Sequence, residues 1–402
     1  MKRTTAIGLL LLATTGLATA AHAACVPTGN IRCNVGLPLD LIDGAQNGIY
    51  NYGYNGAGVD IYIVDSGFSA ANGQAEFGPR YKEVANFTSE PIGGNGNGSH
   101  GITMAKTAAG TSLGVANGAN IRLVRVIGTG ETADSLKKGL EWIRDEKIKL
   151  DQGQPTEFRR QSVVNISLTR AHDPAVNAAV AQLVANQIPV FVAAGNNGLG
   201  GGEGGNACAL TPAGEPSAFT VSAGDAYGSR QGWANYGQCV DGFAWHSHGT
   251  SESTAMTSGV AALIWQQYPT LNAAGLIAEL KNRAQKHTMA NTPFPLNGSQ
   301  NLVVTSLAPA AAPSILGVKS DRCYGSNTLQ WLDSGPEIIA YEVQRSATAN
   351  FAAPVAAYTG TYQSINVNVT GTTYYRVRAC NSRGCSAYVN GNRAATYTPT
   401  CE

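Results

Sequence analysis

Residues 59–67 read VDIYIVDSG, a β-rich apolar run that ends at once in Asp65 and a Ser-Gly turn. Similar apolar runs recur along the chain, at 121–127 (IRLVRVI), 163–168 (VVNISL), 189–194 (PVFVAA) and, more weakly, 218–223. Helical spacing of apolar residues lies between these runs, at Leu136, Leu140 and Ile143 and again over 176–184. Continuous apolar runs separated by helices indicate parallel strands that are buried on both faces. The sequence therefore predicts an α/β fold with a mainly parallel sheet, whose functional loops lie at the carboxyl ends of the strands.

The chain divides into regions with different patterns. Residues 1–23 are typical of a bacterial-type secretory signal, with Lys2 and Arg3 before a short apolar run and Ala21-His22-Ala23 as the cleavage site, for which Ala18-Thr19-Ala20 is the alternative. The α/β pattern fills 24–306, and a Pro/Ala-rich linker covers 307–314. Short alternating strands separated by turns occupy 315–402, which predicts a small all-β sandwich.

Composition narrows the classes of function. Of 402 residues, 43% are hydrophobic and 13% are charged, which is enough to bury a large core and argues against a disordered chain. Lys and Arg number 27 against 26 Asp and Glu, so the net charge is +1 and no basic excess favours nucleic acid. No segment after residue 23 is apolar enough to span a bilayer. We expect a secreted monomer, extracellular or periplasmic.

Eight cysteines follow the signal, and an even number in an oxidising compartment suggests four disulfides. Pairing of nearest neighbours proposes Cys25–Cys33, Cys208–Cys239, Cys380–Cys385 and Cys323–Cys401, although eight cysteines allow 105 connectivities. The Cys and His spacing does not match a zinc finger.

Four residues in the first region carry functional groups at places where strands end or helices begin. Asp65 ends an apolar strand, His100 opens a helix of small residues, and Ser251 opens a helix that runs to Ile264. A serine hydroxyl becomes a nucleophile when an imidazole takes its proton, and a carboxylate holds that imidazole in the right tautomer. Asn196, after the run at 189–194, adds an amide donor for a developing oxyanion. Taken alone, an Asp before Ser-Gly is more often a plain turn, a lone histidine is more often structural, and Gly-Thr-Ser before a helix is more often an N-cap.

Together these motifs resemble the subtilisin-like serine proteases, closest to their proteinase K branch, over residues 38–290. The resemblance rests on Asp65-Ser66-Gly67, His100-Gly101, Ala194-Gly195-Asn196 and Gly249-Thr250-Ser251, in the order that the family has. It implies a three-layer α/β fold in which Asp65 orients, His100 is the base, Ser251 attacks and Asn196 stabilises the oxyanion. It implies hydrolysis of peptide bonds in protein or peptide substrates through an acyl-enzyme, and no cofactor for catalysis.

The same resemblance suggests further site residues. It assigns substrate contacts to Ser167, Leu168, Thr169, Ala194 and Gly195. It also makes Asp225 a candidate ligand of a structural calcium ion, for which one carboxylate identifies little of the oxygen shell. In the last region Trp331, Tyr341 and the run at 374–379 resemble a fibronectin type III domain.

The chain departs from the family pattern near the nucleophile and upstream of it. Glu252 follows Ser251 where relatives have methionine or a small residue, and its effect depends on the direction in which it points. Thr169 and Arg170 replace two glycines at the edge that pairs with substrate, and Arg170 is either solvated or a contact for acidic substrate residues. Between the signal and Leu39 there is no room for the inhibitory propeptide domain of most secreted relatives.

Two alternatives compete with a serine endopeptidase. One is a catalytically inactive secreted binding or adhesion protein on a subtilisin-like scaffold, which the altered cleft would suit. The other is an aspartic protease, because Asp-Ser-Gly occurs at both Asp65 and Asp333. Since Asp333 lies beyond the linker, that pair is poorly placed to form one site.

Overall fold

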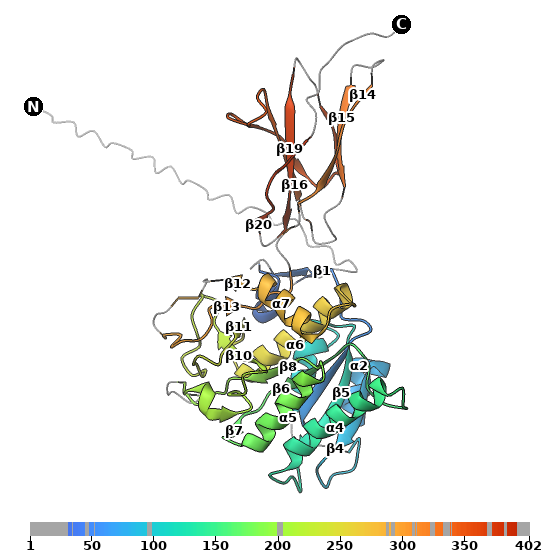
Figure 1. Ribbon diagram of the computed structural model, residues 1–402, viewed down its shortest axis with the longest axis vertical. Helices are drawn as coiled ribbons and strands as arrows, with labels where there is room; N and C mark the ends of the chain where they lie inside the picture. The colour runs from blue at the N-terminus through green and yellow to red at the C-terminus, as the bar shows by residue number, and fades with distance from the viewer. Residues whose placement is uncertain are drawn as a thin grey trace, which may run out of the picture.

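A nine-stranded sheet lies at the centre of the larger, α/β part of the computed structural model (Figure 1). The structure describes residues 31–33, 35–44, 48–51, 53–94, 99–198, 204–286, 289–290, 294–307, 310, 312–321, 326–332, 338, 340–367, 372–381 and 384–391. The strands lie in the order β12 (Gln285–Lys286), β13 (Leu302–Val303), β11 (Gly242–Trp245), β10 (Phe219–Gly224), β8 (Val190–Ala193), β6 (Ser162–Ile166), β3 (Asp60–Ser66), β5 (Asn120–Ile127), β4 (Tyr81–Asn86). Every neighbouring pair is parallel except β12 and β13.

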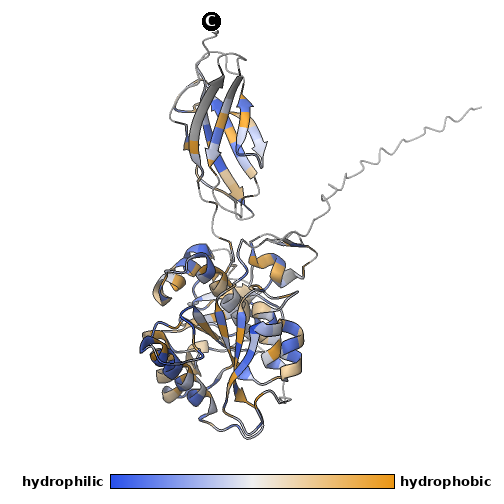
Figure 2. Ribbon diagram, turned by 90° about the vertical axis from the view of Figure 1, so that its right-hand side faces the viewer, coloured by the Kyte–Doolittle hydropathy of each residue, from blue (hydrophilic) through white to orange (hydrophobic). Residues whose placement is uncertain are grey.

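Helices cover both faces of this sheet, as the apolar runs predict. Along β3, Ile61 and Ile63 belong to one hydrophobic core, whereas Tyr62 and Val64 belong to the core on the other face. The first core takes residues from α1 (Leu37–Ile42), α2 (Ala70–Phe77), α3 (His100–Ala109), α6 (Thr250–Gln267) and α7 (Ala273–Arg283). The second takes residues from α4 (Ser135–Asp151) and α5 (Pro174–Ala185). Figure 2 shows hydrophobic segments along the central strands, between these helical layers.

The predicted fold class is confirmed, and the five strands that the sequence predicts, β3, β5, β6, β8 and β10, lie within two residues of their predicted bounds. The largest shift is at β6, which is predicted to reach Leu168 but ends at Ile166. Ser167 then forms hydrogen bonds with Ser251 on α6 instead of continuing the sheet ladder. Several short elements carry no clear pattern in the sequence, namely η1 (Gly78–Arg80), η2 (Ala207–Ala209) and the paired strands β1 (Ile31–Cys33) with β2 (Ile49–Asn51) and β7 (Arg170–Ala171) with β9 (Leu210–Thr211).

Helix α6 is buried along most of its length, although it contains many hydroxyl side chains. The hydroxyls of Thr254, Thr257 and Ser258 donate to the carbonyl oxygens four residues earlier on the helix, at 2.7, 2.9 and 3.1 Å. These bonds satisfy polar groups that would otherwise be costly to bury. Small side chains let α6 pack closely against β6, β8 and β10, which holds its first turn beside the ends of the strands.

Antiparallel strands beyond residue 313 form two further sheets with a core of their own. One contains β14 (Ser314–Asp321), β15 (Ser326–Leu332) and β18 (Ser364–Val367), and the other contains β16 (Ala340–Ser346), β17 (Val355–Gly360), β19 (Tyr374–Asn381), β20 (Gly384–Cys385) and β21 (Val389–Asn390). Trp331 packs edge-on to Tyr341 in this core, with ring centroids 5.5 Å apart. The likeness to fibronectin type III domains and the domain limits stay predictions.

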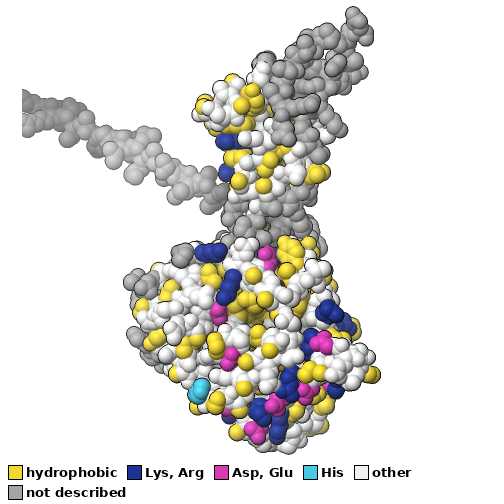
Figure 3. Space-filling model, in the orientation of Figure 1, with side chains coloured by type: hydrophobic (Ala, Val, Ile, Leu, Met, Phe, Trp, Pro, Cys, Tyr) yellow, Lys and Arg dark blue, Asp and Glu magenta, His cyan; other side chains and the backbone are white. Residues whose placement is uncertain are grey.

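Two predicted disulfides are confirmed, Cys208–Cys239 and Cys380–Cys385. Cys33 is also disulfide-bonded. Cys25, Cys323, Cys401, Asp333 and the signal segment 1–23 lie outside the described residues. Within the described ranges, no helix has both the length and the apolar character needed to cross a bilayer. On the face drawn in Figure 3, acidic and basic side chains are intermixed.

Candidate active site

The structure brings Asp65 and His100 together. Asp65 lies at the carboxyl end of β3 and is completely buried, and His100 is the first residue of α3. The imidazole Nδ1 lies 2.8 Å from Asp65 Oδ1 and 3.0 Å from Oδ2. The backbone N–H of Ser66 donates to Oδ1 at 2.6 Å, which fixes the carboxylate. A buried, fixed carboxylate on Nδ1 leaves Nε2 as the ring nitrogen available for chemistry.

Close contact between α3 and the end of β3 sets this geometry. Gly101 N–H donates to the Ser66 hydroxyl at 3.0 Å. A Cβ on Gly101 would lie only 2.0 Å from the Ser66 carbonyl oxygen, so no side chain fits there. The Asp65–His100 contact therefore depends on glycine immediately after the histidine.

Replacing Gly101 with alanine is expected to lower the free energy of unfolding by about 2 to 3 kcal/mol, because α3 must move away from β3. Urea unfolding followed by circular dichroism measures the change. Gly36→Ala is the matched control, since a Cβ there meets no atom within 4 Å and its backbone φ is −66°. Equal midpoints for the two variants would contradict the close-contact argument.

The environment of His100 raises the pKa of its imidazole above the usual 6.5. The hydrogen bond to Asp65 is the main cause, partial burial opposes it, and the charges of Asp65 and Glu252 raise the pKa further. The imidazole is 45% exposed, so solvent reaches it. This side chain can accept a proton close to neutral pH.

Ser251 is buried in the first turn of α6, and α6 packs against α3. Its hydroxyl donates to the Ser167 carbonyl oxygen at 3.0 Å, and the Ser167 hydroxyl donates to the Ser251 carbonyl oxygen at 2.9 Å. Among the described residues, the Ser251 hydroxyl makes no hydrogen bond to His100. The Ser251 hydroxyl must therefore change rotamer before it can donate to an imidazole.

Asn196 follows β8, and its orientation is fixed by Thr250. The Asn196 Oδ1 accepts from the Thr250 N–H at 3.0 Å and from the Thr250 hydroxyl at 2.9 Å. The amide nitrogen Nδ2 is thus left to donate elsewhere. Gly249 has no Cβ. The position that a Cβ would take there lies 3.4 Å from Asn196 Nδ2 and 3.6 Å from the backbone nitrogen of Ser251. Two N–H donors therefore flank one small space beside Ser251.

The predicted substrate contacts Ser167, Leu168 and Thr169 follow β6, and Ala194 and Gly195 follow its neighbour β8. The Thr169 Oγ1 lies 3.3 Å from the point where a Gly195 Cβ would be, so the two segments face each other. Gly195 has φ +101°, a conformation that favours glycine. Whether these residues bind substrate stays a prediction.

Two polar residues that support the site have no assigned role in the sequence analysis. Asn235 donates through Nδ2 to the Ala194 carbonyl oxygen at 2.9 Å, and its Oδ1 accepts from two backbone N–H groups, on Asn197 and Gly205. The Thr250 hydroxyl, which donates to Asn196, also accepts a hydrogen bond from the Gly195 N–H at 3.0 Å. Both shape the exit of β8 that carries Asn196.

Arg125 is a further residue that the sequence analysis does not single out. It is fully buried on β5 beside Asp65 and donates to Glu83 at 2.8 and 3.1 Å and to Glu90. A Cβ on Gly67 would lie 2.0 Å from the guanidinium carbon, so the turn after Asp65 rests on this ion-pair cluster. The signal is an arginine inside the apolar run IRLVRVI, where only a paired charge is tolerated.

Arg170 and Asp225 both form hydrogen bonds with neighbouring residues of the protein. The Arg170 guanidinium donates to the Ala133 carbonyl oxygen at 2.8 Å and lies 3.9 Å from Asp173. The Asp225 Oδ1 accepts from the N–H groups of Tyr227 and Ser229, both at 2.9 Å, which closes a turn. Calcium binding at Asp225, and catalysis without a cofactor, stay predictions.

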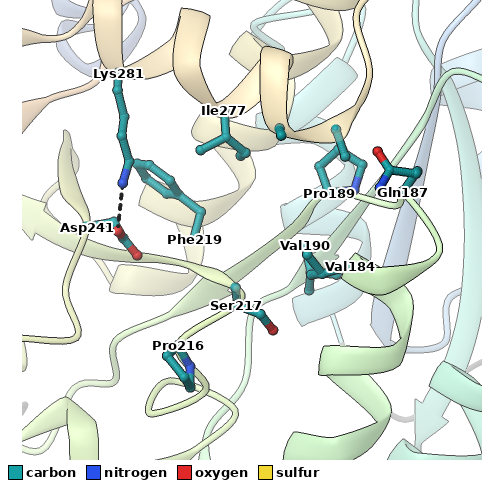
Figure 4. Close-up of a pocket in the computed structure, with 13 residues that line it drawn as sticks. Val184, Gln187, Pro189, Val190, Pro216, Ser217, Phe219, Asp241, Ile277 and Lys281 are labelled. Carbon is teal, nitrogen blue, oxygen red and sulfur yellow. Dashed lines mark hydrogen bonds and ion pairs between the residues drawn. The ribbon is translucent and has the colours of Figure 1, made fainter.

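A pocket of about 350 Å³ lies away from these groups, between α5, α7 and the strands β8 and β10 (Figure 4). It is lined mainly by apolar side chains such as Val190, Phe219 and Ile277, beside the Lys281–Asp241 ion pair at 3.1 Å. Val190 and Phe219 begin their strands, whereas Asn196 follows the end of β8. The pocket therefore lies at the amino ends of the parallel strands, whereas Asp65 and Asn196 lie at their carboxyl ends.

Comparison with known proteins places this chain and its fold in a class, the subtilisin-like serine proteinases. The model of the Subtilase family matches residues 56–318, so the chain belongs to the subtilase family. The structure is similar to the crystal structure of a cold adapted subtilisin-like serine proteinase, with a TM-score of 0.60 and 29% sequence identity over 68% of this chain and 99% of that one.

Curated relatives of the chain also have names that describe serine proteinases. The chain is 31% identical over 280 residues to an "Extracellular serine proteinase" of a Thermus species, covering 63% of this chain and 60% of the relative. It is 28% identical over 278 residues to "Alkaline serine exoprotease A" of Vibrio alginolyticus, covering 65% and 48%. The chain thus spans about half to three fifths of the length of these relatives.

Proposed function

We propose that this protein is a secreted serine endopeptidase that cleaves peptide bonds in proteins or peptides, with Asp65, His100 and Ser251 as its triad. The observation that carries the proposal is the bond between buried Asp65 and His100, because His100 begins α3 and α3 packs against α6, whose first turn contains Ser251. The family supports the reaction class, and the names of extracellular relatives support export.

Catalysis begins when the Ser251 hydroxyl turns from the Ser167 carbonyl oxygen toward Nε2 of His100. Ser251 Oγ attacks the substrate carbonyl carbon while His100 takes the hydroxyl proton. Asp65 accepts the hydrogen bond from Nδ1–H and stabilises the imidazolium. The carbonyl oxygen gains the electron pair of the former double bond and becomes an oxyanion, stabilised by donation from Asn196 Nδ2 and the Ser251 N–H.

The oxyanion intermediate collapses when the C–N bond breaks and His100 gives its proton to the leaving nitrogen. The acyl group is then bonded to Ser251 Oγ. Water repeats the sequence, with His100 as base and then as acid, and releases the carboxylic acid product together with free Ser251.

Covalent labelling tests the proposal directly. A serine-directed fluorophosphonate is expected to label the folded protein, and the label is expected to disappear in Ser251→Ala. The alternative, an inactive binding protein, has one observation in its favour, the bond that holds the Ser251 hydroxyl on Ser167. Folded protein that takes no label and cleaves no peptide would support that alternative.

The pH dependence of kcat/KM is expected to have an acid limb above 6.5. Neutral His100 is the active form. Because its pKa is raised, the imidazole stays protonated up to a higher pH than a free histidine does. Activity therefore rises with pH through that raised pKa, and it falls as pH is lowered below it. Rates on a soluble peptide between about pH 5 and about pH 9 measure the limb. A limb below 6.5, or none in the histidine range, would contradict the assignment of His100.

A further inference from the structure

Glu252 follows Ser251 in the first turn of α6 and is half-buried. Its carboxylate turns back over Gly249, where Oε2 lies 2.6 Å from the position of a Cβ. That same position lies 3.4 Å from Asn196 Nδ2 and 3.6 Å from the Ser251 nitrogen. The carboxylate therefore points toward the space flanked by the two proposed oxyanion donors.

In the part of the chain that the structure describes, no Lys or Arg forms an ion pair with this carboxylate. Among the described residues, Glu252 has no hydrogen bond and no salt bridge, and its charge reaches the imidazole of His100, whose pKa it helps to raise. The positive end of the α6 dipole is its main electrostatic support. An oxyanion on substrate would draw on that same helix end and on the same N–H groups.

Formation of the oxyanion thus places a second negative charge beside Glu252. Repulsion between the two anions is absent from the ground state, where the substrate carbonyl is neutral, so it acts on the transition state. A substrate cation next to the carboxylate would cancel this repulsion as the reaction proceeds. A substrate carboxylate there would add to it.

We propose that Glu252 is a specificity-determining residue that makes this site favour substrates with a basic side chain, lysine or arginine, beside the scissile bond. The proposal rests on the proposed function, because it concerns the rate of the same acyl transfer. Selection operates through kcat/KM, with repulsion of acidic substrates as important as attraction of basic ones.

The test uses two series of fluorogenic peptides. In the first series the residue on the amino-terminal side of the scissile bond is Lys, Gln or Glu, and in the second series the residue on its carboxy-terminal side is varied in the same way. For wild-type protein, kcat/KM is expected to favour Lys over Glu by at least about 30-fold at one of these positions. The isosteric variant Glu252→Gln is expected to reduce that ratio to about threefold or less and to cleave the Gln peptide faster than wild type. Glu252→Lys is expected to invert the preference.

Asp145→Asn is the matched control. It removes the same charge from an exposed ion pair with Arg144 on α4, in the helical layer opposite α6, and should leave the ratio unchanged. Fluorophosphonate labelling of each variant shows that its site is folded. A labelled, active enzyme whose Lys-to-Glu ratio is the same in wild type and Glu252→Gln would overturn the role of Glu252 alone. No labelling and no cleavage of any peptide by wild type would overturn the proposed function with it.

Discussion

Ser251→Ala is expected to lower kcat by about a millionfold on a soluble peptide while leaving KM nearly unchanged. The hydroxyl oxygen is the atom that forms the acyl bond, and an alanine at position 251 has no nucleophilic group to take its place. The remaining rate comes from Asn196 and the Ser251 N–H, which still stabilise the oxyanion when water attacks. Initial rates at saturating substrate, with enzyme concentration set by absorbance, measure the loss.

Ser253→Ala is the matched control on the same helix. Its side chain is buried too, and its hydroxyl donates to the Ala244 carbonyl oxygen at 3.1 Å and, more weakly, to the Gly249 carbonyl oxygen at 3.4 Å, so its loss affects packing and these hydrogen bonds but removes no group of the proposed chemistry. We expect kcat of the folded Ser253 variant to stay within about tenfold of wild type. If Ser251→Ala kept more than about a hundredth of wild-type kcat, Ser251 would not be the nucleophile.

The central sheet could be predicted because its strands are buried on both faces. Ile61 and Ile63 serve one core and Tyr62 and Val64 the other, so no polar residue interrupts the run at 61–64. No strand is predicted at β4, because it lies at the sheet edge and its buried residues alternate with exposed or half-buried ones, which leaves no continuous apolar run. Short strands such as β12 and β13 contain only two residues each, too few for any period.

Within the site, the order of motifs was enough to choose Asp65, His100, Asn196 and Ser251. The sequence could not give the direction of a side chain, because that depends on contacts between distant segments. The hydroxyl of Ser251 bonds to Ser167, 84 residues away, and Glu252 turns over Gly249 rather than into solvent. The buried Arg125 cluster likewise joins β4, β5 and the segment before His100, and no local pattern pairs its members.

Asp65→Asn is expected to reduce kcat by about 10⁴-fold, which is the loss seen when the triad aspartate of a Ser-His-Asp protease is replaced by asparagine. Both Asp65 oxygens lie within 3.0 Å of His100 Nδ1, so an asparagine amide in the same place can offer an N–H to that nitrogen. The imidazole would then carry its proton on Nε2, the atom that must accept the proton of Ser251. The substitution also removes the hydrogen bond to the Asp65 carboxylate, which is the main cause of the raised pKa of His100, together with the charge that adds to it, so the acid limb is expected to move to lower pH.

Asp60→Asn on the same strand separates a catalytic effect from a structural one. Asp60 is as deeply buried as Asp65, but it bonds to Asn120 and Arg122 at the other end of β3. Breaking that pair is expected to lower the free energy of unfolding by about 3 kcal/mol and to leave kcat of the folded fraction nearly intact. Steady-state kinetics and urea unfolding of both variants make the comparison. Equal losses of kcat would mean that Asp65 acts only through the stability of the strand, and Asp65 would then have no direct part in catalysis.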